Sequence, residues 1–102
     1  MAILVDQITA GQTSKPLRVK VGGQKLSTGR ISALGWTGDI LTVQYSPTGT
    51  DQSGGPAKNW ITLGTIPSGG GDLVLEDPVN VIQAILGAGA TGTASIWYEP
   101  GI

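Results

Sequence analysis

Turn-forming residues interrupt this chain so often that no long regular element can form. The 102 residues include 17 glycines and 6 prolines, which separate short apolar runs at roughly the 8–12-residue spacing of sandwiches and barrels. No stretch keeps the apolar period of an amphipathic helix. The sequence therefore predicts an all-β chain: a single antiparallel β-sandwich or jelly-roll-like domain of about seven or eight short strands, covering residues 1–102.

Alternation of apolar and polar residues places the expected strands. Residues 2–9 form the first, and Leu17 to Val21 alternates apolar with basic side chains. Gly22-Gly23 then predicts a tight hairpin to a return strand that runs from about Gln24 to Leu34, with Gly29 as a bulge. After a turn at 35–39, further strands are expected at 40–45, 60–66, 73–75, 79–86 and 93–99.

The strand at 79–86 is apolar on both faces. Val79, Val81 and Ile85 share one face, and Ile82 lies on the other with two further apolar residues. Such a strand is either central in its sheet or covered by a neighbouring subunit. The last strand is expected to place Trp97 and Tyr98 on opposite faces.

Charge is sparse and unevenly distributed. Only 13% of residues are charged, against about a quarter in typical soluble domains, which favours a protein that packs against copies of itself or a larger assembly; a neutral monomer is the alternative. The net charge of −1 argues against nucleic-acid binding. Arg18 and Lys20 lie in a basic early segment, whereas the last third carries only acidic charges. This asymmetry either orients a partner or reflects solvated faces.

Most catalytic designs are excluded by composition. The chain has no histidine and no cysteine, so Ser-His-Asp and Cys-His constellations and the common zinc sites are absent. Glu76 and Asp77 are adjacent, and neighbouring strand residues point to opposite faces, so we interpret them as a solvated strand end. We expect no enzyme activity, no cofactor and no metal.

Residues 87–92 match the letters of the dinucleotide fingerprint, G-x-G-x-x-G. A phosphate cradle also requires a helix that begins at this loop and a further parallel strand. The residues that follow predict a strand instead, so we interpret 87–92 as a glycine-rich hairpin loop. The N-terminal run at 2–5 lacks a basic region and is cut by Asp6, so we expect neither a signal peptide nor a membrane span.

The tryptophans are candidate contact residues. Trp60 and Trp97 fall within expected strands and are interpreted as core or interface anchors, whereas Trp36 falls in a turn and is predicted to make an exposed contact. Together with the two-sided strand and the basic segment, this defines the predicted contacts with a partner or oligomer: Trp36, Val79, Val81, Ile82, Ile85, Arg18 and Lys20.

The second half carries an ordered set of motifs: D-I-L-T-V-Q-Y-S at 39–46, P-T-G-T at 47–50, N-W-I-T-L at 59–63, then the strand 79–86 and T-A-S-I-W-Y at 93–98. This order resembles small β-sandwich virion proteins of tailed bacteriophages, of the head-decoration (cement) or fibre type. The chain departs from that pattern at Pro47-Thr48 and by the insertion at 51–58.

The resemblance implies a non-enzymatic virion protein, assembled in the cytoplasm of a bacterial host. Its expected partners are copies of itself, as a trimer, and the major capsid protein, whose assembly it would stabilise. The alternative hypothesis is a lectin-like, carbohydrate-binding sandwich that engages a host-surface glycan through Trp36 and polar loops.

Overall fold

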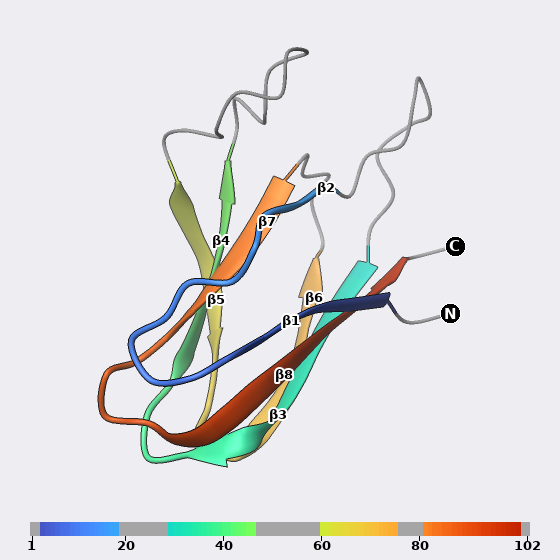
Figure 1. Cartoon of the computed structure of the whole chain (residues 1–102). Helices are drawn as coiled ribbons and strands as arrows, with labels where there is room; N and C mark the ends of the chain where they lie inside the picture. Colours follow the sequence, from blue (N-terminus) through green and yellow to red (C-terminus); the bar gives the residue numbers. More distant parts are fainter. Residues whose placement is uncertain (1–2, 19–28, 47–59, 76–80, 101–102) are drawn as a thin grey trace, which may run out of the picture.

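The fold consists of β-strands only within the part of the chain that is described. The computed structural model describes residues 3–18, 29–46, 60–75 and 81–100. No helix in these ranges is long and apolar enough to cross a membrane. The strands are β1 (Ile3–Ile8), β2 (Leu17–Arg18), β3 (Gly29–Thr37), β4 (Leu41–Ser46), β5 (Ile61–Ile66), β6 (Gly70–Leu75), β7 (Val81–Leu86) and β8 (Thr91–Pro100) (Figure 1).

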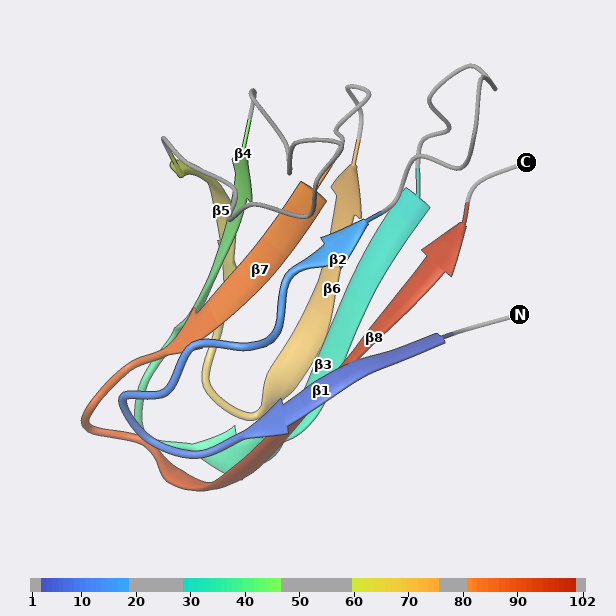
Figure 2. The ribbon, with the colours of Figure 1, turned by 45° about the horizontal axis from the view of Figure 1, so that its top comes forward.

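These strands form two antiparallel four-stranded sheets, ordered β1-β8-β3-β6 and β2-β7-β4-β5, which face each other as a sandwich (Figure 2). The pairs β1 with β8, β2 with β7, β3 with β6 and β4 with β5 are those of one long hairpin whose tip joins β4 to β5. The additional pairs of β3 with β8 and β4 with β7 show that this hairpin is rolled up. That is the jelly-roll arrangement, and the predicted fold class is confirmed.

Two local hairpins were predicted, and the first, at Gly22-Gly23, lies outside the described residues. The described parts of the strands on either side of Gly22-Gly23 are β2 and β3, which lie in different sheets. Residues 87–90 likewise join β7 of one sheet to β8 of the other, so they form a corner and not a hairpin loop. Among the described strands, β4 and β5 are the consecutive pair that is also hydrogen-bonded, and the other pairs join strands that are not consecutive in the chain.

Strict alternation divides the residues of β3 between the core and the surface. Ile31 and Ala33 are buried, whereas Arg30 and Leu34 are exposed. The predicted bulge at Gly29 is wrong, because Gly29 pairs in register with both β6 and β8. The register shifts instead between Leu34 and Trp36, where Gly35 has a φ of +105°, a backbone conformation that favours glycine.

Beyond this shift Trp36 turns inward and is 1% exposed. The expected turn at 35–39 is therefore shorter, since β3 continues through Thr37. Similarly, β6 begins at Gly70, three residues before the strand expected at 73–75. The core that forms between the sheets includes Ile8, Ile31, Ala33, Trp36, Leu41, Val43, Ile66, Leu75, Ile82, Ala84, Leu86, Ala94, Ile96 and Tyr98.

Strand β7 is central in its sheet, between β2 and β4, which explains its two-sided apolar character. The segment before β2 extends this coverage: Gly11 N–H donates to Leu86 O at 2.9 Å, and Ser14 N–H donates to Ala84 O at 2.7 Å. The buried Ser14 hydroxyl accepts the Ala84 N–H at 2.8 Å. The chain between β1 and β2 thus serves as part of the edge of the second sheet.

Three turns meet at one end of the sandwich, which we call the closed end and define by Trp36, Gly38, Asp39, Ser68, Gly87 and Gly89. The Trp36 indole N–H donates to Asp39 O at 2.7 Å. The Asp39 carboxylate accepts the N–H of Ile40 at 2.8 Å and that of Gly89 at 3.0 Å. A Cβ on Gly87 would overlap this carboxyl group. The glycines at 87 and 89 therefore make room for a structural carboxylate.

Candidate interaction surface

Exposed apolar side chains gather on one sheet. Within the described ranges the large hydrophobic residues that are exposed are Leu4, Leu34, Ile40, Ile61, Val74 and Trp97. Four of these six, Leu4, Leu34, Val74 and Trp97, lie on strands of the β1-β8-β3-β6 sheet. Because alternate residues of a strand share a face, these four project from the side opposite the core. Leu4 and Trp97 are direct neighbours in the strand register, whereas Leu34 and Val74 lie on separate rows beside polar residues, so this face combines one apolar pair with further apolar and polar groups.

The strand register arranges this surface in three rows. Leu4, Trp97, Ser32 and Asp72 form the middle row across β1, β8, β3 and β6. Glu99, Arg30 and Val74 form the row on one side, and Gln7, Ser95 and Leu34 form the row on the other. We call these ten residues the outer face. Trp97 lies near its centre.

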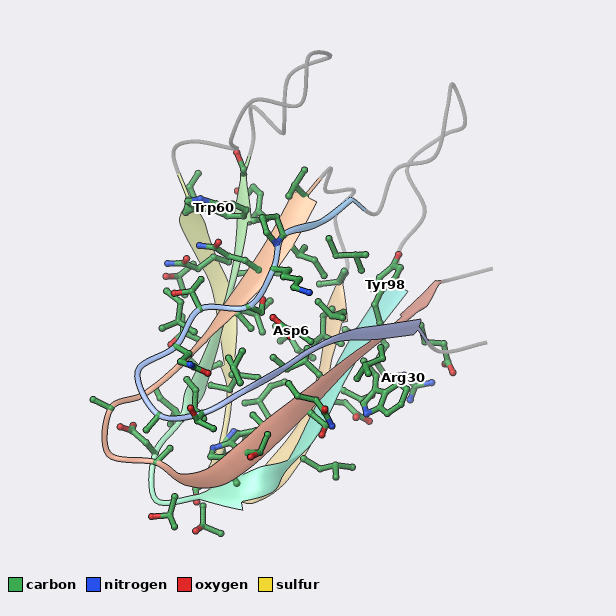
Figure 3. The ribbon with its side chains drawn as sticks, in the orientation of Figure 1. Asp6, Arg30, Trp60 and Tyr98 are labelled. Atoms are coloured by element: carbon green, nitrogen blue, oxygen red, sulfur yellow. The ribbon has the colours of Figure 1, made fainter. Side chains whose placement is uncertain are left out.

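A charged group borders Trp97. The guanidinium Nη2 of Arg30 lies 2.9 Å from Glu99 Oε1, and its Nη1 lies 3.7 Å from Asp72 Oδ2. All three side chains are about half exposed, and Figure 3 shows Arg30 projecting from the side of the sheet turned away from β4, β5 and β7. Exposed pairs of this kind stabilise a fold by ~0–1 kcal/mol. Their larger effect is on which partner can approach.

The outward surface of the other sheet is polar. Gln83 Nε2 donates to Gln44 Oε1 at 2.7 Å across β7 and β4. The neighbouring outward positions on β4 and β5 are threonines, namely Thr42, Thr62 and Thr65. These groups bond to one another or to water without cost. Among the described side chains on this surface, the aliphatic ones include Val81, which is buried, and Ile85, which is partly exposed, and no exposed aromatic residue lies beside them; aromatic residues are typical of interface cores.

Several predicted contact residues lie inside the chain. The exposed contact predicted at Trp36 is wrong, because its indole is 1% exposed and packs in the core. Val81 and Ile82 are 1% and 2% exposed, so their side chains cannot reach a partner either. The reason for Ile82 is that β7 is central and turns this residue toward the first sheet.

The remaining predicted contacts lie elsewhere. Ile85 is partly exposed and faces outward on the polar sheet, where it pairs with Thr13. Arg18 is the last residue of β2 and pairs with Val81. Lys20 and Val79 lie outside the described residues, as do Glu76 and Asp77. Of the predicted contacts whose side chains are described, Trp36, Val81 and Ile82 are buried and Ile85 is partly exposed, so these four do not form one exposed surface.

Sequence reasoning missed most of the outer face. The predicted opposition of Trp97 and Tyr98 is confirmed, with Tyr98 buried at 3% and Trp97 exposed at 36%. Arg30 and Leu34 share a face by simple alternation, which was a usable signal. The proximity of Arg30 and Leu34 to Trp97 could not be predicted in this way, because it depends on pairing between residues more than 60 positions apart.

Other site types find little support in the described ranges. They contain no group of three acidic or other metal-ligating side chains that can hold an ion. A cavity between the sheets measures about 10 Å³ and is lined mainly by apolar side chains such as Val5 and Ile96. That is about the size of one water molecule, and an apolar lining leaves such a space dry.

None of the protein-family models, curated proteins or solved structures compared with this chain matches it.

Proposed function

We propose that this protein is a non-enzymatic structural component of a virus particle, of the capsid-decoration or head-fibre type. It stabilises the particle by packing its outer face against neighbouring subunits. The resemblance of residues 36–99 to small phage virion proteins motivates the virion setting. Jelly rolls recur in viral capsid and lectin domains, and the fold of this chain is analogous to theirs, although one fold can carry many functions.

One observation carries the proposal: Leu4, Leu34, Val74 and Trp97 are exposed together on one sheet face. Burying apolar surface of this kind is favourable by roughly 25 cal/mol per Å². The charged groups on this face are paired, since Arg30 lies 2.9 Å from Glu99 and 3.7 Å from Asp72, and charges that are paired and hydrogen-bonded cost less to bury than isolated ones. A neighbouring subunit can therefore cover this face without isolating a charge.

Reconstitution on stripped particles tests the proposal. Particles from the source that have lost this protein are mixed with the purified chain, sedimented, and heated to measure release of their contents. We expect saturable co-sedimentation and a higher release temperature with the wild-type chain and with Thr65→Glu, a control on the polar sheet, but not with Trp97→Asp. Absence of co-sedimentation at saturating concentration would reject the proposal.

Carbohydrate binding is the second candidate function, with Trp97 in place of Trp36 as the aromatic residue that would stack on a sugar. The buried Trp36 cannot stack on a sugar, whereas Trp97 is exposed beside half-exposed Arg30 and Glu99, whose polar atoms can bond to hydroxyl groups. Titration of host-surface polysaccharide into the chain, read by tryptophan emission, tests this function. We expect a change that is lost in Trp97→Phe if a glycan binds here, and an unchanged spectrum excludes this site.

A further inference from the structure

The cross-strand pairs at the centre of the outer face are complementary in charge and in size. Arg30 pairs with Glu99, Ser32 with Trp97, and Leu34 with Ser95. Each pair thus joins opposite charges or a large side chain with a small one. Within one chain this arrangement leaves Trp97 and Leu34 standing above their small neighbours.

A two-fold axis converts this pattern into an interface. When two copies of a sheet pack face to face about an axis that runs between two paired strands and parallel to them, each residue lies opposite its own cross-strand neighbour in the other copy. For an axis between β3 and β8, Trp97 faces Ser32 of the second copy, Leu34 faces its Ser95, and Glu99 faces its Arg30. Every contact in the centre is then favourable, and the interface is isologous.

From this register we infer that the outer face binds a second copy of this chain, forming a two-fold dimer with the β1-β8-β3-β6 sheets packed face to face. The inference rests on the proposed function, in which a neighbouring subunit covers the outer face. It identifies that subunit as a second copy of this chain. It replaces the three-fold assembly that the phage resemblance implies. Aligned packing of two such sheets, with strand directions within about 30° of each other, is a common arrangement in β proteins.

Charge complementarity favours a second copy over another partner. Arg30 already bonds Glu99 at 2.9 Å in its own chain. In the dimer the two arginines and two glutamates alternate around the axis, so each guanidinium meets a carboxylate of both copies. Bidentate guanidinium geometry suits such a shared network. The unfavourable contact is Leu4 opposite Asp72, which falls on the outermost strands, where water reaches both side chains.

The available area is sufficient for a reversible dimer. Four strands spaced by ~4.8 Å and about 20–30 Å long present roughly 400–550 Å² per copy. Doubling this gives about 1,000 Å², which is near the lower limit for a specific interface. Trp97 near the centre and Arg30 beside it are the residue types that dominate binding energy in interfaces. We therefore expect a dimer that forms and dissociates with concentration.

Sedimentation velocity over a concentration series of about 1–500 µM tests the inference. We expect a shift from monomer to dimer in the wild-type chain and in the Thr65→Glu control. Trp97→Asp should remain monomeric, with its circular dichroism spectrum unchanged because the substitution lies outside the core. A monomer throughout the series, or a trimer, would overturn the inference.

Complementary charge reversal tests the axis itself and does not depend on any loss of folding. Arg30→Glu places carboxylates at both members of the pair in each copy, and Glu99→Arg places guanidinium groups at both. Each variant alone should dimerise at least ~10-fold more weakly, because like charges face each other. An equimolar mixture of the two should recover the dimer. Failure of the mixture to exceed either variant alone would overturn the proposed axis.

The two proposals can fail separately. A chain that stays monomeric but binds stripped particles through Trp97 overturns self-association and leaves the virion function in place. A chain that dimerises through this face but does not bind particles supports the inference and rejects the virion function. A monomer whose emission changes with polysaccharide at Trp97 overturns the dimer in favour of the glycan site.

Discussion

Two regions of this protein are built from a tryptophan and a carboxylate, and they behave oppositely. At the closed end Trp36 is 1% exposed and bonds Asp39 O, while the Asp39 carboxylate accepts two backbone N–H groups. On the outer face Trp97 is 36% exposed, and the nearby Glu99 bonds the half-exposed Arg30. The same residue types therefore serve the fold in one place and are free for a partner in the other.

The difference lies in the contacts that each indole and each carboxylate already makes within the chain. At the closed end the indole is buried and the partly exposed Asp39 carboxylate accepts two backbone N–H groups, so both side chains already have partners within the chain. On the outer face the indole has one uncovered side, and the charged groups face water. Substitutions at the closed end should therefore change the free energy of unfolding, and substitutions on the outer face should change association.

The largest expected effect comes from Trp36→Ala. Removing a fully buried indole should lower the free energy of unfolding by about 3–5 kcal/mol. Urea denaturation followed by circular dichroism measures this change, with Trp97→Ala as the matched control. Equal midpoints for the two variants would show that Trp36 is not part of the core. Trp36→Phe, which retains most of the packing but loses the bond to Asp39, should fall between wild type and alanine.

Asp39 and Gly87 give the next largest effect. Asp39→Ala leaves backbone N–H groups of Ile40 and Gly89 without their partner and should cost about 1–3 kcal/mol. Gly87→Ala should be destabilising because its Cβ overlaps the Asp39 carboxyl group.

In the Asp39→Ala background that overlap is removed, so the cost of Gly87→Ala should shrink. The resulting coupling, ~0.5–3 kcal/mol for groups in contact, is measured by a double-mutant cycle in urea. Additive costs would mean that the glycine and the carboxylate do not share this space.

Trp97 should affect accessibility much more than stability. Trp97→Ala should lower the free energy of unfolding of the monomer by less than about 1 kcal/mol, because the substitution is on the surface. In a Trp60→Phe background, iodide should quench Trp97 and leave Trp36 untouched. Quenching should weaken as protein concentration rises, since the dimer covers Trp97. Quenching that survives in Trp97→Phe would contradict the assignment of the exposed indole.

The smallest effect on stability is expected for the pair of Arg30 and Glu99. Arg30→Gln should change the free energy of unfolding of the monomer by less than about 1 kcal/mol, and added salt should reduce even this difference. Thermal melts at low and high ionic strength measure it. A loss of several kcal/mol in the free energy of unfolding that salt does not reduce would contradict this expectation. It would show that the pair supports the fold in the way that the contacts of the closed end do.

Much of the strand pattern was predictable from local signals. Turn residues and alternation located strands close to β1, β4, β5, β7 and β8, because each short strand has its own period and its own boundaries. The two-sided character of β7 correctly allowed for a central position. The pairing of strands was predicted incorrectly at the loop at 87–92, which suggested a local hairpin while the chain crosses there from one sheet to the other.

The outer face and the closed end could not be told apart from the sequence. Alternation has a period of two, so it divides a strand into two faces without saying which is covered. An uninterrupted β3 would turn Trp36 to the same side as Arg30 and Leu34. The register shift at Gly35 turns Trp36 inward instead. A single glycine within a strand is not enough to predict such a shift from the sequence.

The β character, the short strands, the lack of histidine and cysteine and the low charge of this protein can all be read from residue identity and near neighbours. The burial of Trp36, the exposure of Trp97 and the contact of Glu99 with Arg30 cannot be read in this way. Those outcomes depend on the rolled hairpin, which brings β8 beside β3 and fixes their register. Pairing over such separations is set by the burial of the whole core, which no local segment encodes.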